Sequence, residues 1–275
     1  MGPILPGHSA AGRRFLPSPL PLGLGYGGMN ADLVSIGLKF PRWQDAVEAA
    51  IGSNNLTVAG EVRGGQLVQF SDRSGAQINI LAAEPYATFA GFRSESLAFA
   101  NVTMLSDVIA LLNVVDGAGN DVASLTANLA QGPLIADSEG LTFEQVALTA
   151  LMVDADCYDS ALDYETATGE VLGLFLSPGA ELVASGSGHA TPDAAAEFSA
   201  EVLEAEYRHN ALTGQRFIHA TVDGPFAFDV CLPDREELPQ KGSVVAGTAV
   251  MAGSLLNPVG GACGCGGGSC GCGGH

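Results

Sequence analysis

The chain has 275 residues, of which 47% are hydrophobic and 15% are charged, and this composition excludes a chain that is disordered throughout. Acidic residues number 30 against 11 Lys and Arg, so the formal net charge is −19. We therefore expect neither nucleic acid nor a membrane surface as a partner, because both attract basic proteins. The stretch between Arg93 and Arg208 contains 19 acidic residues and no Lys or Arg. It predicts a solvated acidic face, or a surface suited to a basic protein or a divalent cation.

Residues 1–29 are rich in Pro and Gly and predict a disordered leader. Pro17, Pro19 and Pro21 interrupt the apolar run that a signal peptide needs, and Met29 is an alternative start. The longest apolar stretch lies within residues 244–256, which is shorter than the roughly 20 residues of a membrane span. These features predict a cytoplasmic protein with reduced cysteines.

Internal similarities predict a duplication into two α+β halves, residues 30–137 and 138–256, the second strongly acidic. Residues 65–80 and 169–184 share a pattern of aliphatic pairs around a Gly-Ala turn, so both predict β-hairpins. Gly75 and Gly179 would occupy the turns. Each hairpin follows a segment with helical character, 44–51 in the first half and 144–151 in the second.

Further matches follow in the same order. Val-Asp-Gly occurs at 115–117 and at 222–224, and 132–136 corresponds to 242–246. The middles of the halves differ, because 97–105 predicts a strand whereas 191–209 predicts a helix. That helix would begin at the N-cap Thr191, with Pro192 in its first turn. The predicted fold is thus α+β, built on antiparallel strands and hairpins.

The segment 257–275 is a Gly-rich and Cys-rich stretch that predicts a flexible tail able to bind a soft metal. Its candidate ligands are four thiols and one imidazole, namely Cys263, Cys265, Cys270, Cys272 and His275. Thiolates bind Zn²⁺ and Cu(I), and a Gly-rich chain can wrap a metal without a preformed site. The Cys-Gly-Cys pairs resemble metallothionein-like motifs over this short stretch alone. They lack the Cys-x-x-Cys spacing of zinc ribbons.

Three other interpretations of the tail remain open. Adjacent thiols can exchange with disulfides, although a Cys-x-Cys disulfide closes a strained ring. The tail is also compatible with a low-complexity extension without a selected role, or with a contact to another protein. The two cysteines outside it, Cys157 and Cys231, lie among apolar residues and predict buried, inert thiols.

Several acidic residues resemble part of a calcium-binding loop. Asp154, Asp156 and Glu165 fit its first, third and twelfth positions. However, Tyr158 occupies a ligand position and Asp159 stands where the loop requires Gly. We therefore expect a solvated loop after a helix at this place.

An enzyme site between the two halves is the alternative hypothesis. It would combine His189 or His219 with Asp223, but no nucleophile elbow, zinc-protease motif or phosphate-binding loop supports it. His209 is expected at the C-terminal end of a helix, where a cation is favourable. Both Asp116 and Asp223 predict turns. The function expected from the sequence is that of a binding or assembly protein with a metal-binding tail, without a defined catalytic role.

Overall fold

The computed structural model describes residues 30–188 and 190–256, in which antiparallel β-sheet dominates and helices are few and short. The strands are β1 (Leu56–Val62), β2 (Gly65–Ser71), β3 (Ala76–Ala82), β4 (Ala87–Phe92), β5 (Leu97–Met104), β6 (Ile109–Val115), β7 (Asp121–Leu129), β8 (Leu141–Tyr158), β9 (Phe175–Leu176), β10 (Ala195–His209), β11 (Arg216–Asp223), β12 (Ala227–Pro233) and β13 (Val244–Leu255). The helices are α1 (Ala31–Val34), α2 (Trp43–Gly52), α3 (Gly132–Ile135), α4 (Ala161–Thr168) and α5 (Pro178–Ser185).

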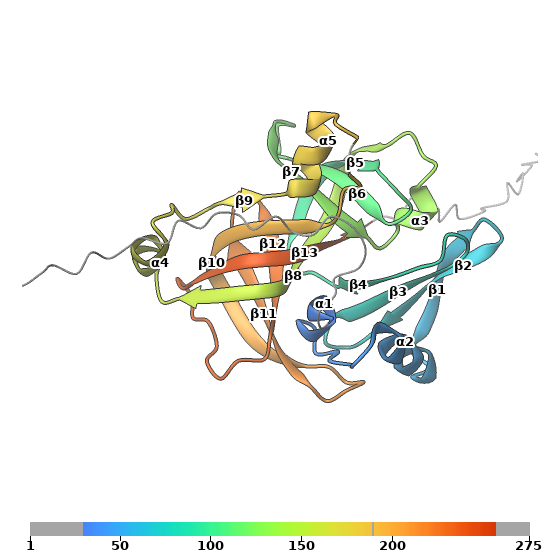
Figure 1. Ribbon diagram of the computed structural model, residues 1–275, viewed down its shortest axis with the longest axis horizontal. Helices are drawn as coiled ribbons and strands as arrows, with labels where there is room; N and C mark the ends of the chain where they lie inside the picture. Colours follow the sequence, from blue (N-terminus) through green and yellow to red (C-terminus); the bar gives the residue numbers. More distant parts are fainter. Residues whose placement is uncertain (1–29, 189, 257–275) are drawn as a thin grey trace, which may run out of the picture.

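The first four strands form a separate antiparallel sheet in the order β1-β2-β3-β4, here called the small sheet (Figure 1). The predicted hairpin at 65–80 is confirmed as β2 and β3, joined by a tight turn at 72–75. Gly75 has a φ of 100°, a conformation that L side chains rarely adopt, so the turn requires glycine there. The predicted helix at 44–51 is also confirmed, since it forms most of α2.

The other nine strands form one sheet. Its strand pairings form two closed rings. Strands β5, β6 and β7 together with β13 and β8 form a ring of five, the first ring. Strands β10, β11 and β12 together with β8 and β13 form the second ring. The antiparallel pair β8–β13 belongs to both rings. Two short parallel contacts, β12 with β8 and β13 with β7, complete the closures.

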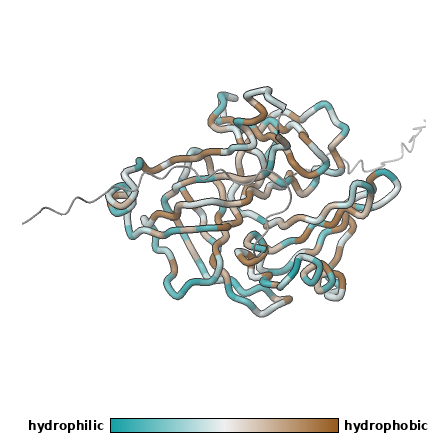
Figure 2. Tube along the Cα trace, in the orientation of Figure 1, coloured by the Kyte–Doolittle hydropathy of each residue, from teal (hydrophilic) through white to brown (hydrophobic). Residues whose placement is uncertain are grey.

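The hydrophobic core fills the rings, because every second side chain along a ring strand points inward. Along β10, Ala196, Phe198, Ala200 and Val202 are all buried, and they join one hydrophobic cluster with side chains from both rings. The strands crossing the centre are accordingly apolar, whereas the peripheral connections are mostly hydrophilic (Figure 2). In the second ring four aromatic side chains pack together, with neighbouring ring centroids 5.0–6.4 Å apart: Phe175, Phe198, Phe226 and Phe228.

The small sheet packs against the outside of the second ring. Phe70, Ile78 and Phe92 of the small sheet share a buried cluster with Leu151 of β8 and Phe217 of β11. Helices α1 and α2 contribute further apolar side chains to this cluster, so they seal the junction. Strand β8 is consequently buried on two sides, by the ring interior and by this junction.

Three predicted elements of the second half are wrong. The segment 144–151 is not a helix but part of β8. The predicted helix at 191–209 is replaced by the strand β10, which begins at Ala195. The segment 169–184 is not a hairpin, because it contains a loop, the two-residue β9 and most of α5.

The remaining matches between the predicted halves have mixed outcomes. The predicted strand at 97–105 is confirmed as β5. Both Val-Asp-Gly segments end a strand at a turn, one after β6 and the other after β11. The segments 132–136 and 242–246 differ, since the first contains α3 and the second leads into β13. The leader 1–29 and the tail 257–275 lie outside the described residues.

The shared pair β8–β13 offers a test of the fold at Gly247. Its φ is 141°, and a Cβ at this position would lie 2.2 Å from the Asp154 backbone oxygen. We expect G247A to lower the free energy of unfolding by about 1–3 kcal/mol, because the backbone of β8 would have to move. Urea unfolding measures this loss. G52A is the control, since a Cβ there meets no atom within 4 Å, and equal losses in both variants would contradict the packing described here.

Within the part of the chain that is described, no helix has the length and apolarity needed to cross a membrane.

Candidate functional site

The register of the second ring brings polar side chains together at the junction with the small sheet. His219 on β11 pairs with Glu206 on β10 and with Cys231 on β12. Because directly paired residues of neighbouring strands share a face of the sheet, these three point to the same side of the ring. Arg208 lies two residues beyond Glu206 on β10 and therefore also on this side. The connection between β4 and β5 crosses the same place and contributes Glu95.

His219 is held by a buried carboxylate. Its Nε2 lies 2.8 Å from Oδ2 of Asp229, and the two side chains are 4% and 0% exposed. Asp229 also accepts hydrogen bonds from the backbone N–H groups of Glu95, at 2.7 Å, and Ser96, at 3.2 Å. Burial alone would raise the pKa of Asp229, but the bonds from His219 and from residues 95–96 outweigh it and hold that pKa below its ordinary value. The carboxylate is therefore ionised.

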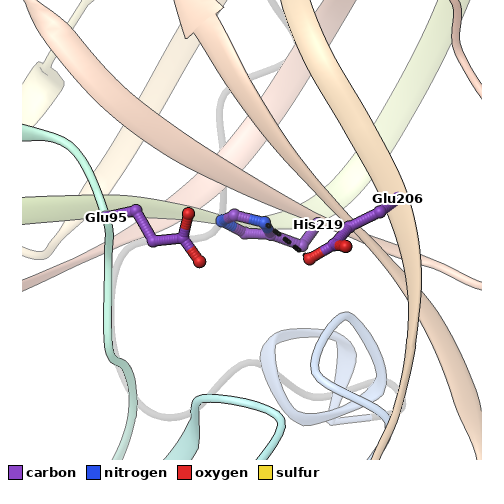
Figure 3. Close-up of side chains that lie close together, drawn as sticks. All are labelled: Glu95, Glu206 and His219. Carbon is purple, nitrogen blue, oxygen red and sulfur yellow. Dashed lines mark ion pairs between the residues drawn. The ribbon is translucent and has the colours of Figure 1, made fainter.

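The other ring nitrogen of His219, Nδ1, lies near a second carboxylate, that of Glu206. An ionised carboxylate can only accept, so the neutral ring carries its proton on Nε2 and keeps a lone pair on Nδ1. Oε1 of Glu206 lies 3.9 Å from Nδ1, beyond hydrogen-bond distance. One ligand atom from each of Glu95, Glu206 and His219 fits within 4.8 Å. The imidazole lies between the two carboxylates (Figure 3).

Arg208 neutralises part of this charge. Its Nη2 lies 2.5 Å from Oε1 of Glu95, and its Nε lies 2.6 Å from Oε1 of Glu206. Its Nη1 donates to the backbone oxygen of Ser74 at 3.2 Å. Burial lowers the pKa of Arg208, but the two carboxylates outweigh this effect and raise that pKa above its ordinary value. Arg208 is thus a permanent cation beside the site.

Phe92, at the end of β4, completes the site. Its ring stacks on the His219 imidazole with centroids 5.3 Å apart, and the Arg208 guanidinium lies 5.7 Å from its centroid. Phe92 is buried. The side chain that fixes the imidazole from its face therefore belongs to the small sheet, and the site depends on the docking of that sheet.

The alternative enzyme hypothesis combined His219 with Asp223, and this choice of carboxylate is wrong. The predicted strand position of His219 is confirmed, but the carboxylate bonded to it is Asp229. Asp223 is exposed at the end of β11, where it closes the hairpin with β12. His189 lies outside the described residues. His209 does not end a helix, because it is the last residue of β10.

The acidic residues weighed as a calcium loop do not form a loop. Asp154 and Asp156 lie on β8, whereas Asp163 and Glu165 lie on α4. Ser160 caps that helix, since its Oγ accepts a hydrogen bond from the backbone N–H of Asp163. Among residues 30–188 and 190–256, the cluster at His219 is the one group of three or more potential ligands.

The predicted turn at Asp116 is confirmed. Its carboxylate accepts hydrogen bonds from the backbone N–H groups of Ala118 and Asn120 and from the Asn120 amide. The bonds with Asn120 and Ala118 lower the pKa of Asp116. These contacts give Asp116 a local structural role.

The two cysteines of the folded part differ. Cys231 is buried as predicted, and burial together with the nearby charge of Asp229 raises its pKa well above the ordinary value. Cys157 is exposed, contrary to prediction, and its Sγ accepts a contact from the Arg235 guanidinium at 3.3 Å. The predicted ligands of the tail, Cys263, Cys265, Cys270, Cys272 and His275, lie outside the described residues.

Glu95, Glu206, Arg208 and Asp229 were not identified from the sequence as parts of a site. One signal was available for Asp229. The segments 216–223 and 227–233 can be predicted as a hairpin with a short turn. In that hairpin His219 and Asp229 lie on the same face of the two strands, in neighbouring cross-strand pairs. No comparable local signal connects Glu95 to His219, since they are far apart in sequence.

Comparisons with known protein families, with curated proteins and with solved structures give no significant match to this chain. The site is therefore interpreted from its chemistry alone.

Proposed function

We propose that this protein binds a divalent transition-metal ion, with Zn²⁺ the best fit, through Glu95, Glu206 and His219. The observation that carries the proposal is the orientation of His219, whose Nε2 is bonded to the buried Asp229 while Nδ1 lies 3.9 Å from Oε1 of Glu206, with Glu95 in the same cluster of potential ligands. Metal-binding histidines commonly donate their second N–H to a carboxylate, which fixes the ring and increases its basicity. One imidazole and two carboxylates suit Zn²⁺ and its neighbours in the first transition row.

The charges and distances agree with this assignment. Three carboxylates and the Arg208 guanidinium carry a combined charge of −2 when His219 is neutral, which one divalent ion balances. Bond lengths of about 2.0–2.1 Å in a tetrahedral zinc site separate two ligand atoms by roughly 3.4 Å. The 3.9 Å between Nδ1 and Glu206 Oε1 is close to this value. Glu95 and Glu206 are 63% and 55% exposed, so their side chains are free to adjust.

The metal would connect two parts of the chain that are distant in sequence. Glu95 comes from the connection between the small sheet and β5, whereas Glu206 and His219 belong to the second ring. An ion bound to all three would tie the small sheet to the ring. The immediate function is then metal binding that also fixes the junction.

Zinc titration of the full chain carrying C263S, C265S, C270S and C272S tests the proposal, because these substitutions remove the thiols of the tail. We expect one equivalent of Zn²⁺ to bind in calorimetry. At about 100 times Kd, binding should stabilise the folded protein by roughly 2.7 kcal/mol, seen as a rise in Tm.

H219Q and E206Q in the same background are expected to weaken zinc binding by about 100-fold or more, a larger loss than replacement of an outer partner causes. E204Q is the matched control, because Glu204 is exposed one cross-strand row away on the same strand and face. Zinc affinity that is equal in H219Q and E204Q would contradict the site.

The tail and the acidic surface are separate proposals. In a reducing compartment such as the cytoplasm, four thiols and His275 would give the chain a second, softer site for Zn²⁺ or Cu(I). Comparison of metal uptake by the full chain and by the four-serine variant measures this contribution. The excess of acidic over basic residues favours a basic protein partner over nucleic acid.

We also infer an internal duplication, with boundaries that differ from the predicted halves. The strands β5 to β8 and β10 to β13 follow one another in the same order around the two rings, and each unit lends its last strand to the other ring. Parallel contacts of β12 with β8 and of β13 with β7 occupy corresponding places. The Val-Asp-Gly segments at 115–117 and 222–224 follow the second strand of each unit. The small sheet lies outside this repeat.

A further inference from the structure

We infer that the leader of this chain, through residues 16–21, occupies an apolar groove between α2 and the small sheet. The inference is independent of the proposed metal site. It assigns to the groove an intramolecular occupant with the chemistry of a proline-rich peptide.

One wall of the groove is the outer side of α2. Ala46 and Ala50 of this helix are fully buried at the junction. Trp43, Val47 and Ile51 follow one another at a spacing of four residues, so they continue the apolar side of the helix beyond its buried part. Trp43 and Val47 are half-buried, and Ile51 is 54% exposed. The helix therefore presents apolar surface that the described residues leave uncovered.

The other wall is a row of paired residues across the small sheet, along which α2 lies (Figure 1). The row runs through Val58, Val68, Ile80 and Thr88, one from each strand. Val58 is 57% exposed, and Val68 and Ile80 are half-buried. Between this row and the helix lies a hollow of about 270 Å³, lined by Trp43, Gln44, Val47, Glu48 and Thr88.

The leader contains a segment suited to such a groove. From Leu16 to Pro21 every second residue is Pro. Pro fixes its own φ and confines the preceding residue to extended conformations, so this segment predicts a polyproline II helix. Six residues of that helix span about 19 Å, against about 15 Å for the ten residues of α2. Proline-rich segments of this kind dock in aromatic-lined grooves at a low entropic cost.

The leader joins the described chain beside the groove. Asn30, the first described residue, donates from Nδ2 to the backbone oxygen of Phe40 at 3.2 Å. Phe40 precedes Trp43 by three residues, which is at most about 11 Å of chain. The connecting residues 22–29 span up to about 28 Å when extended. Residues 16–21 can therefore reach the groove and lie along it.

Charge favours the leader over the folded part of a second copy. All 30 acidic residues lie within 30–256, whereas the leader has Arg13 and Arg14 and no acidic residue. Glu48 is exposed at the groove and forms no ion pair within the described residues. A second acidic folded part would be repelled there, and the Arg pair attracted. Exposed ion pairs contribute little, so apolar contact with Trp43 carries the binding.

Acrylamide quenching of tryptophan fluorescence tests the inference in the full chain, because Trp43 is its one tryptophan. We expect the double variant L16S/L20S to be quenched at least about twofold more efficiently than the wild type, because the leader would no longer cover the indole. I4S/L5S is the matched control. It removes two apolar side chains of the leader outside residues 16–21 and should keep the wild-type quenching. Both variants leave residues 30–256 unchanged.

Dilution distinguishes the chain's own leader from that of a second copy. We expect the quenching of the wild type to be independent of protein concentration, as an intramolecular contact requires. Protection of Trp43 that is lost on dilution overturns the inference, because another copy would then fill the groove. Equal quenching of the wild type and L16S/L20S overturns it as well, and so does an increase in I4S/L5S as large as that in L16S/L20S.

Discussion

Replacement of Asp229 with Ala is expected to lower the free energy of unfolding by about 3–5 kcal/mol, the typical effect of breaking a buried polar pair. Asp229 is fully buried and satisfies three donors, namely Nε2 of His219 and the backbone N–H groups of Glu95 and Ser96. Without its carboxylate these donors have no acceptor. Urea unfolding at neutral pH measures the loss.

D223A is the control for Asp229, because Asp223 is an exposed Asp on the neighbouring strand. We expect D223A to change the unfolding free energy by less than about 0.5 kcal/mol. D229N keeps the shape of the side chain and one acceptor, so it should lose less than D229A and remain folded. Because Asp229 orients a metal ligand, D229N should also weaken zinc binding by about 10–100-fold. Equal stability of D229A and D223A would contradict the buried pair.

The pH dependence of this effect follows from the direction of the pKa shift. The pKa of Asp229 is lower in the folded chain than in the unfolded chain, so the folded state holds fewer protons on this group. Its contribution to stability is complete above the ordinary carboxyl pKa of about 3.9 and is lost as the pH falls through the lower folded value. The stability difference between the wild type and D229N should therefore narrow below about pH 4.

Phe228 is the second position with a large expected effect. F228A should lower the free energy of unfolding by about 3–5 kcal/mol, since the ring is fully buried and its removal leaves a cavity. Its edge meets Phe198 at 5.2 Å, and Phe175 and Phe226 pack around it. Denaturant unfolding monitored by circular dichroism measures the change.

F143A is the matched control for F228A. Phe143 is exposed and stacks on one ring, Phe99, at 4.6 Å, so its removal should cost only about 0.5–1.5 kcal/mol. If F228A and F143A are equally stable, the interior of the second ring is not packed as described.

The first part of the fold was predictable because its signals are local. The turn at 72–75 separates two alternating strands, and α2 has helical periodicity over ten residues. In β8, by contrast, residues 146–152 are all buried, because one side of the strand faces the ring interior and the other faces its packing partners. Such a strand loses its alternation, and the run was therefore interpreted as a helix.

The error at β10 has a different cause. Its interior positions alternate as Ala196, Phe198, Ala200 and Val202, but alanine also favours helices. The register then shifts between Val202 and Glu204, which breaks the period of two in the middle of the strand. Since Glu206 lies beyond this shift, the misassigned helix also concealed a potential ligand.

The site itself depends on contacts that a linear sequence does not display. His219 and Asp229 lie ten residues apart across one hairpin, but Glu95 reaches them only because the small sheet docks on the second ring. The four cysteines of the tail, by contrast, are easily recognised in the sequence but lie outside the described residues. The tail can be recognised from its amino-acid composition, whereas the His219 site forms only through tertiary packing.

The sharing of β8 and β13 by both rings has a consequence for synthesis on the ribosome. Translation produces β5 to β8 before the strands of the second ring, but the first ring cannot close until β13, more than eighty residues after β8, has emerged. Until then β7 and β8 present unpaired edges to other chains. Because both rings contain β13, neither ring can close before residues 244–255 have been synthesised.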